Sequence, residues 1–443
     1  MKKLTSGSPW KLILSFTIPL LVGNFFQQMY SFTDTLVVGQ ILGKDALAAV
    51  GSTGSLMFLM MGFSMGLTSG FAIITAQRFG AKDYVGVKCS FATSVCLSGI
   101  ATIILTVINL FFLRPILLLM QTPDAIIDMA EAFFRFIVIG FFATMICNLL
   151  SNILRSIGDS QTPLFFLIIS TIINVVLELF FILILKMGVV GAGVATLLAQ
   201  AIAGLLCLFY IYRKIPILQI HFSDLKKIKK EDLIQHIHSG VPMAFQASII
   251  AIGSVILQSV LNSLGTDVVA AQASSSRIDQ FAILPMMSFG ITMATFTAQN
   301  WGAKKYKRII KGVKQGLLLS IAFSIMAGII EICFGENLVK LFVKAKEVRV
   351  IALAQTYFNI NGSMYWILSI LFILRYTLQG LGKTAIPTIA GIVELLMRSG
   401  SAIILTLFFG FIGAAWAAPL AWSGAVIILM PSYLISHKKL KRM

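Results

Sequence analysis

Two acidic residues lie inside long apolar stretches and have no basic residue within one helical turn. Gln27 and Tyr30 precede Asp34 by seven and four residues. Asn174 precedes Glu178 by four residues. On a helix, these spacings place neutral hydrogen-bonding side chains on the same face as each carboxyl. Such a carboxyl is suited to bind and release a proton, or to exchange a proton for sodium. The alternative is a permanently protonated acid that only stabilises helix packing.

The other ionisable residues in apolar stretches have simpler explanations. Burying a charge in a membrane costs about 2.5 kcal/mol or more, so each charge needs a partner or a route to water. Glu394 and Arg398 are four residues apart and are expected to form a structural ion pair on one helix. Arg277 and Asp279 are expected to pair because they lie close in sequence. Glu331 is expected near the outer end of its helix, with its carboxyl extended to the membrane surface.

The composition indicates which elements position these side chains. Of the 443 residues, 58% are hydrophobic and 12% are charged. A soluble domain has about 25% charged residues, so this chain has too little charge to cover a water-exposed surface. We therefore expect an integral membrane protein.

Twelve apolar stretches are long enough to cross a membrane, since a transmembrane helix needs about 20 mostly apolar residues. The runs are continuous and do not alternate every second residue, which excludes a transmembrane β-barrel. We predict an all-α polytopic membrane protein with twelve transmembrane helices. The stretches are 12–36, 48–76, 89–113, 132–154, 163–186, 189–211, 240–263, 270–297, 312–334, 352–379, 386–408 and 410–435.

The distribution of basic residues predicts the orientation of these helices. The net charge is +18, and of the 35 Lys and Arg residues 25 fall on the side of the N-terminus and 9 on the opposite side. Because cytoplasmic loops carry the excess of positive charge, both termini are expected in the cytoplasm. This asymmetry accounts for the basic charge, so nucleic-acid binding is not expected. The five cysteines form no CxxC motif, and neither a zinc site nor a disulfide framework is predicted.

An internal repeat divides the chain into two halves. AQRFGAKDY from Ala76 recurs as AQNWGAKKY from Ala298, with six of nine residues identical at an offset of 222. Other segments, and Pro19 with Pro242, pair at nearly the same offset. Each half has six spans, and because six is an even number, both halves enter the membrane in the same orientation. Parallel repeats of this kind occur in many secondary transporters. The alternative is a duplicated structural protein without a transport path.

The repeat predicts two lobes with a cytoplasmic connection. Segment 223–238 reads as an amphipathic helix on the membrane surface, with Ser223 as its cap. The expected parts are an N-terminal six-helix lobe at 1–211, a basic linker at 212–239, a C-terminal six-helix lobe at 240–435 and a basic cytoplasmic tail at 436–443.

Small residues in the second stretch predict close helix packing. Gly62, Gly66 and Gly70 form two overlapping GxxxG motifs. Such a row of glycines lets two helix backbones approach each other in a membrane. We therefore expect this face to be structural.

The two halves differ in their acids. The positions equivalent to Asp34 and Glu178 fall near Ile256 or Leu257 and near Ala402, which are apolar. Ion coupling is therefore expected in the first half. Pro19 lies 15 residues before Asp34, and a proline inside a helix can kink it and leave it able to bend.

Segments of both halves, in order along essentially the whole chain, resemble the multidrug and toxic compound extrusion (MATE) family. In the first half they are TDTLVVGQILGKDALAAVG, NILRSIGDSQTP, and NVVLEL followed by GVVGAGVATLLAQ. In the second half they are AAQASSSRIDQFAILP, AQNWGAK, and ELLMR followed by GAAWAAPLAW. The resemblance implies a secondary antiporter and not an enzyme, with two six-helix lobes around a V-shaped cavity. The implied activity is export of cationic amphipathic compounds across the cell membrane in exchange for protons or sodium ions. The implied partners are small organic cations and membrane lipids, with a functional monomer and no cofactor besides the coupling ion.

The resemblance also assigns roles to residues. Asp34 becomes the coupling acid of the first span, with Tyr30 and Gln27 as its network. Pro19 matches the proline at which that span is proposed to bend. A sodium ion, if it is the coupling ion, is expected at Asp34 and Glu178. The cluster is completed by Glu178, Asn174, Thr196 and Asn152.

Two departures from the family pattern matter. The family usually reads Asn-x-x-Leu-Asp-Pro where residues 174–179 read NVVLEL, so Glu178 replaces Asp and the proline is lost. One branch of the family has acids in the seventh and tenth spans, where this chain has Gln246 and Leu368. Gln246 is therefore expected as a neutral cavity residue. The choice between proton and sodium stays open.

Other functions are less consistent with these residues. A flippase or exporter of a lipid-linked precursor is the main alternative, and it favours a cationic groove for phosphate. The embedded charges of the first half are acidic, which favours cationic cargo. A membrane-embedded enzyme of the zinc-protease type lacks its usual signature because no HExxH motif is present.

Overall fold

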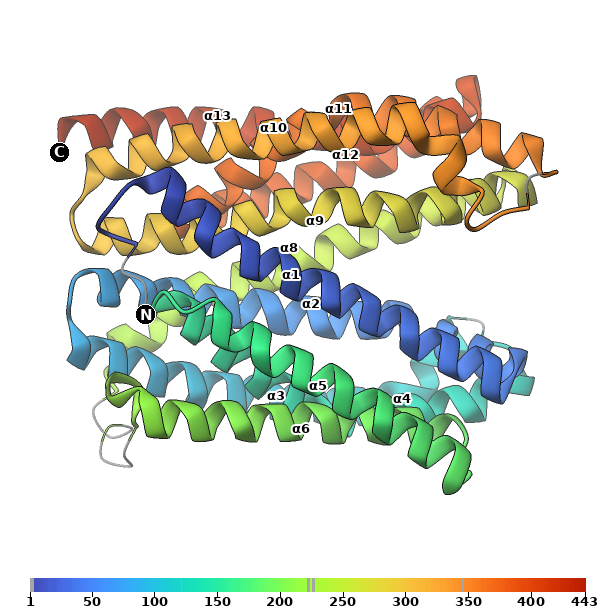
Figure 1. Cartoon of the computed structure of the whole chain (residues 1–443), viewed down its shortest axis with the longest axis horizontal. Helices are drawn as coiled ribbons and strands as arrows, with labels where there is room; N and C mark the ends of the chain where they lie inside the picture. Colours follow the sequence, from blue (N-terminus) through green and yellow to red (C-terminus); the bar gives the residue numbers. More distant parts are fainter. Residues whose placement is uncertain (1–3, 121, 221–223, 225–227, 345) are drawn as a thin grey trace. The chain divides into compact units, whose positions relative to one another are not determined.

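The chain is all-helical in the computed structural model, which describes residues 4–120, 122–220, 224, 228–344 and 346–443 (Figure 1). No strand occurs among these residues. Twelve of the helices are long and apolar enough to cross a membrane. The prediction of an all-α protein with twelve transmembrane helices is therefore confirmed.

The helices follow the predicted stretches but extend beyond most of them, because polar residues continue the helices past the apolar core. The six of the first half are α1 (Pro9–Val37), α2 (Lys44–Gly80), α3 (Tyr84–Leu119), α4 (Asp124–Ser156), α5 (Gln161–Leu179) and α6 (Val189–Lys214). The six of the second half are α8 (Lys230–Asn262), α9 (Thr266–Gly302), α10 (Tyr306–Val339), α11 (Val348–Gly380), α12 (Ala385–Phe409) and α13 (Phe411–Arg442). Single π-helical turns, η1 (Val38–Leu42) and η2 (Phe180–Ile184), continue α1 and α5, and η3 (Pro216–Leu218) is a short 3-10 turn.

The internal repeat is visible in the backbone as well as in the sequence. Lys82 and Lys304, which are 222 residues apart, both have a positive φ, of 61° and 56°. Gly43 and Gly265, at the same offset, have φ of 87° and 102°. Side chains disfavour this left-handed region, so its recurrence at matched positions shows that the two halves turn in the same way between helices.

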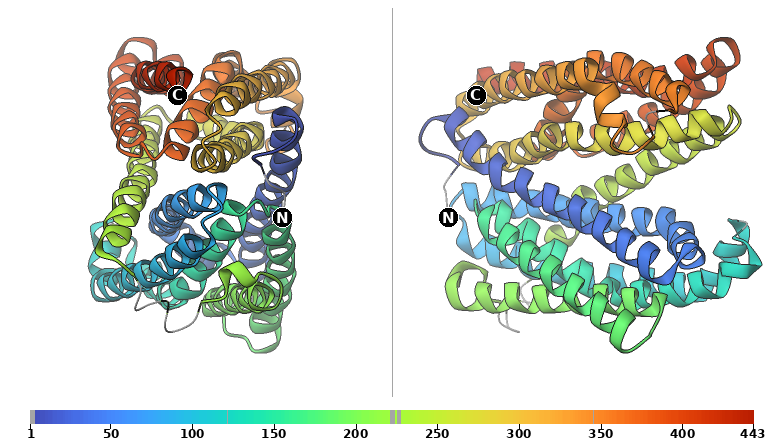
Figure 2. Two further views of the ribbon diagram at one scale, coloured as in Figure 1. Left: turned by 90° about the vertical axis from the view of Figure 1, so that its left-hand side faces the viewer. Right: turned by 45° about the vertical axis from the view of Figure 1, so that its right-hand side comes forward.

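Contacts between the helices divide the chain into two compact units at positions that the sequence did not predict. Among the described residues, the first unit contains Val22–Ala244, and the second contains Phe245–Met443 together with residues 4–21. Both α1 and α8 are therefore divided between the units. In the left view of Figure 2, many helices of each unit are seen nearly end-on.

Helix ends extend into the segments that were expected to be a linker and a tail. The 212–239 linker is much shorter in the structure, because α6 runs to Lys214 and α8 already begins at Lys230. Residues 230–238 of the expected surface helix at 223–238 form the start of α8. The proposed cap of that surface helix, Ser223, lies outside the described residues. The 436–443 tail continues α13 to Arg442.

The first unit includes the start of α8, which packs on α2 through glycines. A Cβ added at Gly66 would lie 2.4 Å from the carbonyl oxygen of Met243, and one added at Gly70 would lie 2.5 Å from the Cα of Gly240. Ser239 Oγ donates to the carbonyl of Gly70 at 2.9 Å. For Gly66 and Gly70, the predicted close helix packing is confirmed.

The second unit includes the first half of α1, which packs on α9. Ile13 and Phe16 are almost fully buried in one apolar cluster with Phe289. Thr17 Oγ1 and Thr292 Oγ1 are 2.8 Å apart and share a hydrogen bond. Each unit is thus completed by half of a helix from the other repeat.

Candidate functional site

The acids predicted to carry ion coupling meet in the first unit. Asp34 comes from α1 and Glu178 from α5, and their carboxyls lie close enough to interact electrostatically. Each acid is followed within four residues by a π-helical turn, η1 or η2. Such turns are frequent at functional sites because they shift the side chains around them.

A neutral network lies next to this acid pair. Tyr30 Oη and Thr196 Oγ1 are 3.2 Å apart, and Asn174 Nδ2 donates to Thr196 Oγ1 at 3.3 Å. Thr196, on α6, therefore links side chains from α1 and α5. The structure brings together five of the predicted residues, namely Asp34, Glu178, Tyr30, Asn174 and Thr196.

Three of the four carboxyl oxygens of the acid pair are buried without a hydrogen-bond partner among the described residues. Glu178 is fully buried, and neither of its carboxyl oxygens has a partner among the described residues. The same is true of Asp34 Oδ1 and Asn174 Oδ1. Ionised carboxylates only accept hydrogen bonds, so a bond between two of them requires a proton. Because buried polar groups are normally satisfied, this group of oxygens is suited to a proton or a small cation.

Asn152 was predicted to belong to this cluster, but the structure places it in another polar group. Its Nδ2 donates to Thr68 Oγ1 at 2.9 Å, and its Oδ1 accepts from Arg155 at 3.4 Å. Gln27, predicted as part of the Asp34 network, lines a small pocket of about 80 Å³ together with Asn152 and Arg155. The reason is that Gln27 lies two helical turns before Asp34, too far along the helix axis to share its partners.

Gln246, predicted as a neutral cavity residue, belongs to a buried amide pair in the structure. Its side chain is only 4% exposed, and its Oε1 accepts a hydrogen bond from Gln379 Nε2 at 3.0 Å. The amide pair is thereby satisfied inside the second unit between α8 and α11.

Glu394 and Arg398 form the expected ion pair, with 3.0 Å between Arg398 Nη2 and Glu394 Oε1. A second cation joins it, because Arg375 Nη2 lies 2.6 Å from Glu394 Oε2. All three residues line a cavity of about 350 Å³ in the second unit. The sequence did not indicate this third member because Arg375 comes from a different helix, α11.

The expectations for Glu331 and for Arg277 with Asp279 are wrong. Glu331 is only 2% exposed and accepts from Tyr365 Oη at 2.6 Å. Asp279 accepts hydrogen bonds from the hydroxyls of Tyr357, at 3.0 Å, and Tyr365. Arg277 is exposed, because residues two apart on a helix face different directions.

Close packing explains why Glu331 faces inward. A Cβ added at Gly328 would lie 2.2 Å from the carbonyl oxygen of Gly362, so α10 and α11 approach closely at this level. Gly328 lies three residues before Glu331, and Gly362 lies three residues before Tyr365. This spacing puts the two side chains at the same helix contact. One sequence signal pointed to this group: Tyr357, Asn361 and Tyr365 recur every fourth residue on one face of α11.

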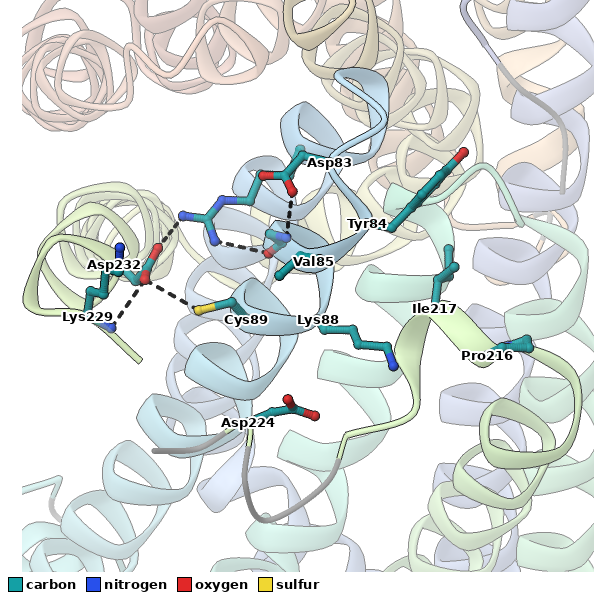
Figure 3. A pocket seen from close by; sticks show the side chains of 12 residues that line it. Asp83, Tyr84, Val85, Lys88, Cys89, Pro216, Ile217, Asp224, Lys229 and Asp232 are labelled. Carbon is teal, nitrogen blue, oxygen red and sulfur yellow. Dashed lines mark hydrogen bonds and ion pairs between the residues drawn. The ribbon is translucent and has the colours of Figure 1, made fainter. Parts of the chain in front are cut away.

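The repeated AQRFGAKDY motif borders a surface pocket of about 900 Å³ in the first unit. Figure 3 shows Asp83, Cys89, Lys229 and Asp232 among the residues that line it. Arg78 bonds the carboxylate of Asp232 and, at 3.0 Å, the carbonyl of Gly86. Cys89 Sγ donates to Asp232 at 3.4 Å. These bonds tie α2 and α3 to the start of α8, and the pocket was not predicted from the sequence.

Comparisons with known proteins match nearly the whole chain. The MatE family model matches residues 19–180 and 242–404. A Bacillus subtilis protein named probable multidrug resistance protein YpnP is 29% identical over 380 residues, which cover 85% of this chain and 84% of that protein. A second B. subtilis protein, probable multidrug resistance protein YoeA, is 27% identical, and the match covers 88% of this chain and 85% of that protein. A Shewanella oneidensis protein named FAD transporter is 22% identical, and the match covers 72% of this chain and 70% of that protein.

Solved structures share the fold. One, described as the outward-facing conformation of a multidrug resistance MATE family transporter of the MOP superfamily, matches with a TM-score of 0.93 at 22% identity. The match covers 100% of this chain and 98% of that one. A structure of MATE in the straight conformation matches with a TM-score of 0.91 at 23% identity, over 100% of this chain and 99% of that chain.

Proposed function

The chain belongs to the MatE family, the multidrug and toxic compound extrusion transporters, and from this premise we propose that it exports organic cations in exchange for protons or sodium ions bound at Asp34 and Glu178. The observation that carries the proposal is a pair of neighbouring carboxyls in which both Glu178 oxygens and Asp34 Oδ1 are buried without a donor among the described residues. Two negative charges in such a place repel one another unless a cation is bound between them.

Ion binding at this pair can drive transport because the pair joins two helices. A bound proton or sodium ion removes the repulsion between Asp34 on α1 and Glu178 on α5 and favours the state in which the carboxyls meet. Loss of the ion favours a state in which they separate. Coupling requires this difference in ion affinity between the two states.

Both candidate ions are consistent with the oxygens present. A proton needs one donor oxygen and one acceptor, which the two carboxyls provide. A sodium ion needs several oxygen ligands, and Asn174 Oδ1 is a further oxygen of this cluster that has no partner among the residues described. Ion gradients imposed one at a time distinguish these alternatives.

Cationic amphipathic cargo is supported by charge and by the names of relatives. The acids of the first unit offer negative charge to cargo as well as to ions. The B. subtilis relatives are named for multidrug resistance. The distribution of basic residues supports a cell-membrane orientation with both termini in the cytoplasm.

A cargo that carries phosphate is less well supported. One relative, from Shewanella oneidensis, is named FAD transporter, and FAD carries phosphate. A phosphate needs basic groups that are free to bind it, whereas the two arginines that line the cavity of the second unit, Arg375 and Arg398, both bind Glu394. FAD and a lipid-linked phosphate are therefore the competing substrates to test.

The test is transport in lipid vesicles that contain the purified full-length chain. Ethidium efflux is measured under a proton gradient and, separately, under a sodium gradient, with FAD and a prenyl phosphate as competitors. We expect one gradient to drive efflux, Asp34→Asn to abolish the driven efflux, and the exposed-residue control Asp45→Asn to leave it unchanged. Efflux that responds to neither gradient would refute ion-coupled export.

A further inference from the structure

We propose that the second unit contains a proton site of its own, formed by Asp279, Tyr365 and Glu331. The proposal rests on the proposed ion-coupled export only for the use of that proton in transport. The site was not predicted, because ion coupling was expected in the first half alone. Its three residues come from three helices, α9, α11 and α10.

The geometry places one tyrosine hydroxyl between two carboxyls. Tyr365 Oη lies 2.6 Å from Glu331 Oε2 and within hydrogen-bonding distance of Asp279 Oδ1. The other oxygen of Asp279 accepts from Tyr357 Oη at 3.0 Å. Tyr365 is fully buried, and the two acids are almost so.

Counting hydrogens shows that the site must hold an additional proton. A tyrosine hydroxyl has one hydrogen, so Tyr365 can donate to only one of its two carboxyl neighbours. If both acids were ionised, the other contact would bring two acceptor oxygens together in a buried place. One carboxyl is therefore protonated and donates to Tyr365 Oη. The chain of three groups holds one shared proton beyond that of the tyrosine.

A second observation also indicates a missing positive charge. Glu331 Oε1 is buried and has no hydrogen-bond partner among the described residues. The nearby arginines do not bond either acid, because Arg375 and Arg398 both bind Glu394. The titratable and charged groups around the site are Asp279 on α9, Glu331 on α10, Tyr357, Tyr365 and Arg375 on α11, and Glu394 and Arg398 on α12. These groups include three carboxyls and two arginines, so the addition of one proton makes the whole group neutral.

The site has a route to water. Asp279 and Tyr357 line the cavity of about 350 Å³, together with Arg398. A proton from cavity water can add to Asp279, which then passes its proton to Tyr365 Oη while Tyr365 passes its own hydrogen to Glu331. One proton has then moved to Glu331, and Tyr365 again carries one hydroxyl hydrogen and no charge.

Infrared spectroscopy on the full-length chain in lipid nanodiscs tests the site without any cargo. The carboxylic-acid C=O band is recorded at acidic and alkaline pH in a chain with Asp34→Asn and Glu178→Gln, which removes the acid pair of the first unit, and in the same background with Glu331→Gln, Asp279→Asn or Tyr365→Phe added. We expect a band that disappears at alkaline pH, is missing in Glu331→Gln or Asp279→Asn, and is shifted in Tyr365→Phe, which keeps the ring and removes the bridge. Glu336→Gln is the matched control, because Glu336 is exposed on the same helix.

The proposal is overturned if the band does not titrate, if Glu331→Gln and Asp279→Asn both leave it unchanged, or if sodium removes it at constant pH. A second measurement addresses coupling: the protons exchanged per exported ethidium ion should fall by about one in Glu331→Gln and stay constant in Glu336→Gln. An unchanged ratio would overturn the role of the site in transport. Because the infrared result needs no transport, failure of export under any gradient and failure of this site are distinguishable.

Discussion

Pro19 and Pro242 occupy equivalent places in the two repeats, and three residues after each of them the chain passes from one compact unit to the other, at Val22 and at Phe245. Both helices, α1 and α8, continue through their prolines. A proline removes one backbone hydrogen bond and crowds the preceding turn, so a helix bends most easily there. The weak points of the two long helices therefore coincide with the borders of the units.

Replacing these prolines should slow transport and stabilise the fold. Pro19→Ala or Pro242→Ala restores a backbone hydrogen bond, and a proline inside a helix costs about 3 kcal/mol. We expect a higher thermal unfolding temperature and slower ethidium efflux in vesicles, with the double variant slowest. Pro431→Ala in α13, away from the borders, is the control for stability alone. Wild-type efflux rates in both single variants would contradict a bending role.

Shortening the second acid of the first unit should weaken ion coupling without changing charge. Glu178→Asp withdraws the carboxyl by about 1.5 Å, the length of one carbon–carbon bond, and the contact with Asp34 is lost. We expect about tenfold weaker apparent ion affinity, which corresponds to about 1.4 kcal/mol. The measurement is ethidium efflux at increasing proton or sodium concentration, with the exposed Glu336→Asp as control. Unchanged ion affinity would argue against a joint role of the two carboxyls.

Removing the shared carboxylate of the second unit should destabilise it strongly. Glu394→Gln leaves Arg375, whose side chain is 6% exposed, without its counter-charge. Breaking a buried ion pair by removing one partner costs about 3–5 kcal/mol. We expect a marked fall in unfolding temperature, and a smaller one for Arg398→Met, because Arg375 then still pairs with Glu394. Equal unfolding temperatures for the wild type and Glu394→Gln would show that the cluster contributes little to stability.

The glycine contact in the first unit gives a matched pair of variants on one helix. In Gly70→Ala the new methyl group meets the backbone of α8 and forces it away from α2, at a cost of about 1–3 kcal/mol. In Gly54→Ala an added Cβ meets nothing within 4 Å, and alanine favours a helix over glycine by about 1 kcal/mol. Thermal unfolding in detergent should therefore shift in opposite directions. A stabilised Gly70→Ala variant would contradict the close packing.

Part of the candidate site could be predicted because its members are neighbours on single helices. Tyr30 with Asp34, and Asn174 with Glu178, follow from spacings of four residues. Asn152 and Gln246 were assigned by resemblance alone, and the structure gives each a different partner, Thr68 and Gln379. Resemblance places a residue on a helix, but the rotation of that helix decides what its side chain contacts.

The sequence by itself determined the twelve membrane helices, their order, their duplication and the two lone acids of the first half. These follow from the length of apolar runs and from repeated motifs, which are local properties. Only the tertiary structure decided that α1 and α8 are each divided between the units, and that Asp279 and Glu331 meet at Tyr365. Such contacts depend on the rotation and close approach of helices far apart in the chain, as between Gly328 and Gly362, and no spacing along the sequence records them.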